Sequence, residues 1–293
     1  MNVHHLELFY YVAKHGGISR AVRAMPYGIQ QPAVSGQLRA LETELGVRLF
    51  ERTPFRLTAA GEKLQQFVEP FFGRLESVRE ELRAGDAPVL RLGAAEVALR
   101  DHVPEIAAQL RRTLPGLRLK MRAGLQAQLA GWLREGEIDL AIAATGARSP
   151  AGLRCKRLLR LRLALLVPTR ARYRDAEDFF ARKPADVAHI GLPATEAISR
   201  EFDRALRVRG VRWPMRIEAN SLFMIAQYVA QGQGVGVSLE WPGLARVPGV
   251  KALPLPEAAI EVAALWRDEP TPLIQAFLAE AERHLAEQGA GRI

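Results

Sequence analysis

The sequence predicts an α/β protein built from a small helical N-terminal domain, a long linking helix and a two-lobed C-terminal domain. Short amphipathic segments fill residues 1–58, one seven-residue apolar repeat fills residues 59–88, and strand and helix patterns alternate through residues 89–293. The alternation occurs twice, which places lobe one at residues 89–167 and 267–293 and lobe two at residues 168–266.

The composition is that of a globular protein. Of the 293 residues, 48% are hydrophobic and 25% are charged, and no apolar stretch approaches the roughly 20 residues that a membrane span needs. The N-terminal segment lacks the charged and then apolar profile of a secretory signal. Cys155 is the one cysteine, which excludes an intramolecular disulfide and agrees with a reducing compartment. We therefore expect a cytoplasmic protein without a membrane partner.

The net charge of +9 suggests an anionic partner, but it does not locate one. Residues 1–88 hold 11 Lys and Arg against 10 Asp and Glu, whereas residues 89–293 hold 30 against 22. The positions of individual basic side chains are therefore more informative than their sum.

Two short helices open the chain. The first is predicted from apolar residues at i, i+3, i+4 and i+7, and it ends at Gly16 and Gly17. Its buried positions are Leu6, Phe9, Tyr10 and Ala13. The second is expected to follow Ser19 as its N-cap and to run from Arg20 to Met25.

The third helix is expected to begin at Pro32, where the missing N–H costs nothing. Its apolar stripe consists of Val34, Leu38, Leu41 and Leu45, and its opposite side carries Pro32, Gly36, Arg39 and Thr43. Glycine inside a helix costs about 1 kcal/mol relative to alanine. Gly36 therefore indicates either a surface that another molecule approaches closely or a neutral substitution on a solvated face.

A two-stranded ribbon is predicted after Gly46. Residues 47–52 alternate in polarity, residues 53–55 form a turn, and residues 56–58 return. Three short helices followed by such a ribbon form a winged helix-turn-helix, whose third helix fits a major groove about 12 Å wide. Arg52 and Arg56 at the tip of the ribbon would then reach phosphates or the minor groove.

These sixty or so residues resemble the N-terminal domain of LysR-type transcriptional regulators. The resemblance is carried, in the family's order, by Ser19-Arg20-Ala21, Gln31-Pro32-Ala33-Val34-Ser35, Leu41-Glu42, Glu44-Leu45-Gly46-Val47-Arg48-Leu49-Phe50-Glu51-Arg52 and Leu57-Thr58-Ala59-Ala60-Gly61. It implies that the start of the third helix touches base edges and sugar-phosphate and that Arg52 touches the DNA backbone. The DNA-binding candidates are Ser19, Gln31, Pro32, Ser35, Gly36, Gln37, Arg39, Arg52 and Arg56.

The chain departs from the family's pattern in two places. The family usually has arginine where this chain has Gly36, so a bidentate guanine contact is absent there and the operator preference is expected to differ. The turn at residues 26–30 is about two residues longer than the common form, and the wing is shorter.

A long helix is predicted from Thr58, as N-cap, to about Ala84. Apolar residues spaced by four and three residues form a seam over about 39 Å of helix, typical of pairing with a second copy. The seam consists of Leu64, Val68, Phe71, Leu75, Val78 and Leu82. Pro70 is expected to kink or interrupt the helix. The alternative is a helix packed against its own C-terminal domain.

The remaining residues alternate between strands and helices, which predicts a mostly parallel sheet with right-handed crossovers. Strands are expected at 89–93, 117–122, 140–143, 163–167, 189–192, 215–219, 235–239 and 262–266, and helices at 104–113, 126–134, 198–209, 222–231 and 272–288. Strands 163–167 and 262–266 are expected to cross between the lobes. Two lobes joined in this way resemble the periplasmic-binding-protein-like effector domain of the same family.

A ligand is expected beyond the carboxyl ends of the parallel strands and against helix N-termini, where free N–H groups favour anions. The candidate effector-binding residues at these places are Ala95, Glu96, Gly124, Gln126, Ala194, Thr195, Asn220 and Ser221. Glu96 stands where the family often has a hydroxyl residue, and a carboxylate there would repel an anionic effector. We expect Glu96 to stabilise the start of its own helix instead.

Nothing in the sequence indicates catalysis. The six histidines show neither metal-ligand spacing nor a nucleophile elbow, so no catalytic residue, metal or cofactor is expected. The basic cluster of Arg154, Lys156, Arg157, Arg160 and Arg162 indicates a solvated face or a subunit contact before it indicates a DNA-backbone site.

The leading hypothesis is a sequence-specific DNA-binding regulator of transcription. It would bind double-stranded DNA at an inverted repeat as a homodimer or homotetramer, under the control of a small-molecule effector, with RNA polymerase as a further candidate partner. The competing hypothesis is an effector-independent DNA-binding or architectural protein. An enzyme fused to a DNA-binding module comes third.

Overall fold

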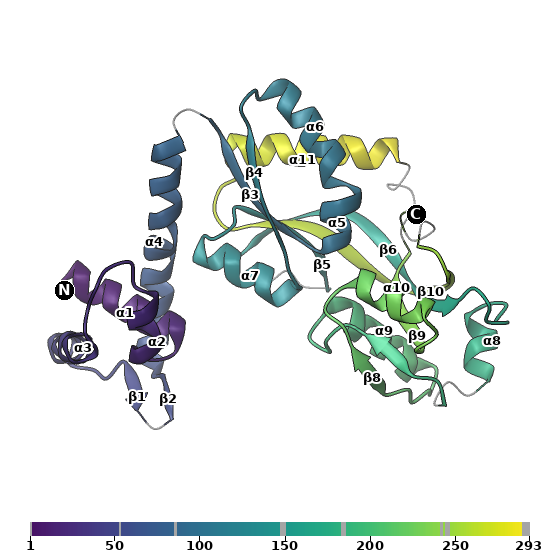
Figure 1. Cartoon of the computed structure of the whole chain (residues 1–293), viewed down its shortest axis with the longest axis horizontal. Helices are drawn as coiled ribbons and strands as arrows, with labels where there is room; N and C mark the ends of the chain where they lie inside the picture. The colour runs from purple at the N-terminus through teal and green to yellow at the C-terminus, as the bar shows by residue number, and fades with distance from the viewer. Residues whose placement is uncertain are drawn as a thin grey trace. The chain divides into compact units, whose positions relative to one another are not determined.

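The computed structural model describes residues 2–52, 54–84, 87–146, 151–182, 186–240, 243 and 247–288. The chain divides into two compact units (Figure 1). The first is Met1–Gly85 with Arg134–Glu137, and the second is Asp86–Leu133 with Ile138–Ile293. In the described part of the chain, no helix combines the length and apolar character needed to cross a bilayer.

The first unit contains the winged helix-turn-helix that the sequence predicts. Its described elements, purple to blue in Figure 1, are α1 (Val3–His15), α2 (Ile18–Ala24), α3 (Gln31–Leu45), β1 (Phe50–Arg52), β2 (Phe55–Leu57) and α4 (Ala59–Ala84). Strands β1 and β2 pair antiparallel, with Arg52 opposite Phe55. Phe55 was expected in the turn, but it belongs to the second strand because its ring stacks on Phe50 at 5.1 Å.

Glycines set the ends of the short helices. Gly16 follows α1 with φ 62° and Gly46 follows α3 with φ 68°, both in the left-handed region that glycine adopts without strain. The expected N-cap at Ser19 is wrong. Gly17, with φ 154°, precedes α2, and its carbonyl accepts the first helical hydrogen bond from Ala21 at 3.0 Å.

Helix α3 begins one residue earlier than expected, at Gln31, because Pro32 fits the first helical turn without an N–H donor. Its predicted stripe is confirmed: Val34, Leu38 and Leu41 are buried, and Leu45 packs partly buried against the same core. The core joins α1, α3, the ribbon and the first half of α4 through Leu8, Phe9, Val12, Val34, Leu38, Leu41, Leu49 and Val68.

Thr58 acts as the predicted cap of α4. Its hydroxyl accepts a hydrogen bond from the Gly61 N–H at 3.1 Å and donates one to the Arg48 carbonyl at 2.6 Å. A Cβ at Gly61 would lie 2.1 Å from the Leu49 carbonyl oxygen, so only glycine permits this close approach of helix and ribbon. The helix runs past Pro70 to Ala84, so the proline does not end it.

The second unit is the predicted pair of α/β lobes. Its described strands are β3 (Val89–Ala94), β4 (Arg118–Ala123), β5 (Leu140–Thr145), β6 (Arg154–Pro168), β7 (His189–Gly191), β8 (Met215–Glu218), β9 (Val235–Leu239) and β10 (Val250–Trp266). Its described helices are α5 (Glu96–Asp101), α6 (Val103–Thr113), α7 (Gln126–Glu135), α8 (Ala176–Ala181), α9 (Ala197–Val208), α10 (Leu222–Ala230) and α11 (Pro272–Glu287). The sequence reading had no separate α5 and missed α8.

The described strands of this unit form one eight-stranded sheet in the order β4-β3-β5-β10-β6-β9-β7-β8. Within each lobe the short strands pair parallel: β3 with β4 and β5, and β7 with β8 and β9. The two crossing strands β6 and β10 pair antiparallel with each other and with their neighbours β9 and β5. The predicted crossing strands 163–167 and 262–266 are the most apolar parts of these longer strands.

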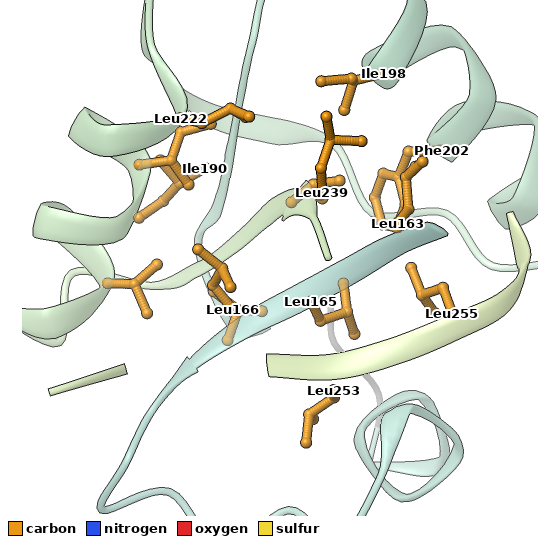
Figure 2. Close-up of a cluster of buried hydrophobic side chains, with 14 of the residues drawn as sticks. Leu163, Leu165, Leu166, Ile190, Ile198, Phe202, Leu222, Leu239, Leu253 and Leu255 are labelled. Atoms are coloured by element: carbon orange, nitrogen blue, oxygen red, sulfur yellow. The ribbon is translucent and has the colours of Figure 1, made fainter. Parts of the chain in front are cut away.

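Each lobe has its own buried core. In lobe two, the crossing strands and the helices α9 and α10 enclose a cluster whose side chains converge in Figure 2, including Leu163, Leu165, Ile190, Phe202, Leu222 and Leu255. In lobe one, α6 and α11 pack together over the sheet (Figure 1). Their apolar residues join those of the strands, among them Leu92, Ile106, Leu110, Leu140 and Phe277. These cores hold the ends of the parallel strands in fixed positions.

Lobe two buries an imidazole that titrates abnormally. The His189 ring stacks on Trp213 at 4.6 Å and lies 5.3 Å from Phe202. Burial lowers the pKa of His189 from 6.5 to about 4. Between about pH 6.5 and pH 4, the imidazole of His189 therefore binds a proton in the unfolded chain but stays neutral in the folded chain.

We predict that stability falls as the pH decreases from about 6.5 to about 4, and that His189→Phe weakens this dependence. Keeping this imidazole neutral in the folded chain does not change the free energy of unfolding at neutral pH, but it lowers that free energy by about 2 kcal/mol near pH 5. Urea unfolding of the wild type and of His189→Phe, at neutral pH and near pH 5, measures the difference in unfolding free energy. An equal loss of unfolding free energy in the wild type and the variant would contradict this assignment.

Candidate functional site

The outward side of α3 is the polar surface that the sequence predicts. Gln31, Pro32, Gly36 and Arg39 are exposed, whereas Ser35 and Gln37 are half-buried beside the core stripe. Ser19 of α2 donates a hydrogen bond to the Gln31 side-chain oxygen at 3.1 Å, which joins the two helices of the motif. A Cβ at Gly36 would meet nothing within 4 Å, so packing within the described chain does not require glycine there.

The ribbon carries its basic side chains beside an acidic one. The Arg56 guanidinium donates to the Glu51 carboxylate across the two strands. This pair is exposed, so it is weak and the guanidinium can exchange its partner. The backbone of Arg52 ends β1, and its side chain lies outside the part of the structure that is described.

Helix α4 carries exposed apolar side chains along a line that shares Phe71, Leu75 and Val78 with the expected seam and adds Phe67. We call this line the α4 stripe, which consists of Phe67, Phe71, Leu75 and Val78. Phe67 is 72% exposed and Phe71 is 59% exposed. Val68 is instead buried at 2%, and Leu64 packs partly buried against the same core. Val68 is therefore wrong as a seam residue, because the core of the first unit already covers it, whereas the place of Leu64 in the seam stays a prediction.

Sequence reasoning missed Phe67 because α4 is apolar on two sides in its first half. A seam through residues 64 and 68 and a stripe through residues 67 and 71 both fit spacings of three and four. The side chain of Leu82, the last expected seam residue, lies outside the described residues.

The second unit contains a cavity of about 730 Å³ between its lobes. Six of the eight predicted residues line it, at the starts of α5, α7 and α10: Ala95, Glu96, Gly124, Gln126, Asn220 and Ser221. Ala194 and Thr195 are not among the lining residues, so their contact with an effector stays a prediction. Leu192 and Glu196, which flank this loop, line the cavity.

Glu196 is the residue at this site that sequence reasoning missed. It precedes α9 in lobe two, and its carboxylate oxygen Oε2 accepts a hydrogen bond from the Gln126 N–H of lobe one at 3.2 Å. The side chain is 5% exposed, and its second oxygen, Oε1, has no hydrogen-bond partner among the described residues. Burial raises the pKa of Glu196, while the Gln126 N–H and the Arg200 charge oppose that rise. Its place before a helix was visible in the sequence, but its burial was not.

Other helix N-termini at the cavity also bind side chains of the chain itself. The Gln128 side-chain oxygen accepts from the Leu125 N–H at 3.0 Å, and the Ser221 hydroxyl accepts from the Met224 N–H at 3.1 Å. Glu96 is the first residue of α5, where the helix dipole favours a carboxylate, as expected. The helix N-termini that would attract an anion are thus partly occupied by side chains of the chain itself.

The lobe-one end of the cavity holds a hydrogen-bonded pair of histidines. His102 Nδ1 lies 3.1 Å from His284 Nε2, and His284 Nδ1 lies 3.1 Å from the Glu105 carboxylate. Burial, followed by the neighbouring His284, lowers the pKa of His102. Among the residues that the structure describes, no three His, Cys, Asp or Glu side chains are arranged so that they could hold a metal ion together.

The basic cluster of residues 154–162 lies on β6. Arg154 pairs with Glu269, and the Lys156 ammonium lies 2.7 Å from the Glu282 carboxylate. These ion pairs within the second unit favour the interpretation as a solvated, internally paired face over a DNA-backbone site.

Two family descriptions match the chain. Residues 3–62 match "Bacterial regulatory helix-turn-helix protein, lysR family". Residues 83–286 match "LysR substrate binding domain". The first range covers the winged helix-turn-helix, and the second contains both lobes and the cavity.

Two transcriptional regulators are similar to this chain over most of their length. The HTH-type transcriptional regulator YofA of Bacillus subtilis (strain 168) is 28% identical over 236 residues, which cover 79% of each protein. The transcriptional activator protein LysR of Escherichia coli (strain K12) is 25% identical over 247 residues, covering 81% of this chain and 77% of that protein.

Solved structures share the fold. The LysR family regulator CbnR matches with a TM-score of 0.62 at 18% identity, covering 97% of this chain and 99% of that one. HinK from Pseudomonas aeruginosa, also a LysR family regulator, matches with a TM-score of 0.57 at 22% identity, covering 98% and 99%. With a DNA-binding helix-turn-helix followed by a substrate-binding domain that encloses an effector cavity, the chain belongs to the LysR family of transcriptional regulators.

Proposed function

We propose that this regulator binds an inverted-repeat operator as a homodimer or a dimer of dimers, and that a small molecule between its lobes controls that binding. The observation that carries the proposal is the cavity of about 730 Å³ in a chain whose other unit presents a polar α3 surface. Such a volume is in the range of small-molecule sites. One unit would read DNA and the other would sense a metabolite.

The DNA-reading residues follow from the exposure of α3. Gln31 and Pro32 at its start and Arg39 on the same outward side are available to a major groove, and Ser35 lies between them. Arg52 and Arg56 of the ribbon would contact phosphates. A solved structure of full-length CbnR is described as complexed with its target DNA, which supports the same use of this fold here.

The α4 stripe supports the dimer. Four large apolar side chains exposed along one helix are costly in water, and pairing with a second copy would bury them. Two copies related by a two-fold axis would present two α3 helices to two half-sites, which gives more discrimination than one short helix.

The cavity favours effector control over effector-independent binding. Its lining comes from both lobes, so a ligand that fills it would bind one arrangement of the lobes better than another and shift their equilibrium. We further propose that the protein acts in the cytoplasm, has no catalytic activity and can contact RNA polymerase from the bound operator.

Footprinting and salt titration of labelled upstream DNA test the proposal. We expect protection with two-fold symmetry and an affinity that falls steeply as salt rises, because each phosphate contact releases counterions. Protection without symmetry would contradict the dimeric operator. An effector screen by thermal shift tests the sensing part, since a bound ligand raises the melting temperature.

We predict that Gln31→Ala relaxes the base preference at one operator position, at a cost of about 1–3 kcal/mol on the preferred sequence. Arg52→Ala should weaken binding to all sequences and reduce the salt slope by about 1 per subunit, or about 2 for the dimer. The matched control is Arg207→Ala, which removes an exposed positive charge from α9 of lobe two. Competition binding with single-base operator variants measures both effects. Equal losses on specific and random DNA for Gln31→Ala would refute its role in base reading.

We predict that the double variant Phe67→Glu, Phe71→Glu is monomeric, because four charges would have to be buried in the paired α4 stripe. Both rings are exposed, so the first unit should keep its fold. Val208→Glu, which changes a side chain that is 75% exposed in lobe two, is the control. Sedimentation gives the mass of each protein. A double variant that keeps the mass of the wild type would show that another surface forms the dimer.

A further inference from the structure

The charged side chains that line the cavity between the lobes are acidic. Its charged lining side chains are Glu96 and Glu196, and none of the described residues that line it is Lys or Arg. The other titratable lining residues are His102 and His284. Burial lowers the pKa of His102, so that imidazole is neutral at neutral pH. A carboxylate ligand would therefore meet negative charge without a countercharge in the lining.

Glu196 already occupies the place where an anionic ligand would be expected. Its Oε2 atom accepts the Gln126 N–H at the start of α7, so a carboxylate of the chain itself takes the anion position at this helix. The N–H groups of Leu125 and Met224 are likewise bound to side chains of the chain. Three of the N–H groups that could recognise an anion at these helix starts are thus already used.

The second oxygen of Glu196 has no partner. Oε1 is buried and accepts no hydrogen bond from the described residues, although the side chain is only 5% exposed. A buried charged oxygen without a partner is costly. A positively charged group in the cavity beside this carboxylate would offset the cost of its burial.

The arginine side chains near the cavity bind other groups of the chain. Arg200 donates to the Thr195 carbonyl and, at 3.3 Å, to the Gln126 side-chain oxygen. Arg100 pairs with Asp101 at 2.8 Å, and its guanidinium lies 5.2 Å from the centre of the Phe223 ring. Neither side chain is part of the cavity lining. Glu196 therefore lines a cavity to which none of the described residues contributes a Lys or Arg, and the Arg200 charge acts on its carboxylate from outside that lining.

Most of the remaining lining is apolar, with Leu159, Leu161, Phe223, Met224, Val262 and Phe277 among its side chains. We propose, on the basis of the proposed effector function, that the cavity binds an apolar molecule that carries a protonated amino or amidino group. That group pairs with the Glu196 carboxylate, which lines the cavity, and the apolar body fills the space between the lobes. Because Glu196 of lobe two also binds Gln126 of lobe one, the ligand strengthens a contact that joins the lobes.

The test compares three probes with the same phenylethyl body: phenethylamine, 2-phenylethanol and 3-phenylpropanoate. Isothermal titration into the full-length protein at neutral pH gives each affinity. We expect the amine to bind roughly tenfold more tightly than the carboxylate or better, as a charge-assisted hydrogen bond predicts. Carboxylate binding as tight as amine binding, or no binding of the amine, overturns the proposal.

Two variants locate the effect. Glu196→Gln keeps the size of the side chain and should weaken amine binding roughly tenfold, while binding of the alcohol changes about twofold or less. Glu201→Gln, on the same helix but paired with Arg204 outside the cavity lining, should leave the amine affinity unchanged. Circular dichroism confirms that both variants are folded. Unchanged amine binding by folded Glu196→Gln overturns the proposal.

Operator footprints with each probe separate this inference from the proposed function. If only the carboxylate alters the footprint, effector control stands and the amine inference fails. If the amine binds through Glu196 without altering the footprint, the inference stands and the proposed regulatory link fails.

Discussion

The burial of one stripe of α3 is the constraint on which the rest of the molecule depends. Val34, Leu38 and Leu41 are covered by α1 and the ribbon, and at 3.6 residues per turn this fixes the opposite side of the helix in solvent. The polar side chains there include Gln31 and Arg39. A single helix of this kind discriminates poorly among DNA sequences, which is why we propose a second copy that pairs through the exposed α4 stripe of the same unit.

The second unit depends on two long strands. Because β6 and β10 are continuous through both lobes and pair with each other along their length, the lobes share one sheet, with a cavity between them. Parallel strands and the starts of α5, α7 and α10 meet at that cavity, where Glu196 spans from one lobe to the other. A ligand there acts on the relation between the lobes, which is the property that a sensing domain requires.

The sequence predicted what local periodicity and turn chemistry determine. The stripe of α3, the glycines at 16 and 46 and the cap at Thr58 were all visible as patterns, and six of the eight cavity residues followed from the rule for strand ends. The full length of β6 could not be predicted, because arginines interrupt the apolar residues in its first half. The burial of Glu196 and Val68 was also hidden, because it depends on contacts with distant segments rather than on neighbours in sequence.

The most direct test of the central claim places a photocrosslinker on the outward side of α3. Gly36→Cys in a Cys155→Ser background gives one attachment point, and a Cβ there meets nothing within 4 Å. The account predicts crosslinks to major-groove bases at two operator positions related by two-fold symmetry. Crosslinks confined to one position, or none on DNA that the labelled protein still binds, would contradict it.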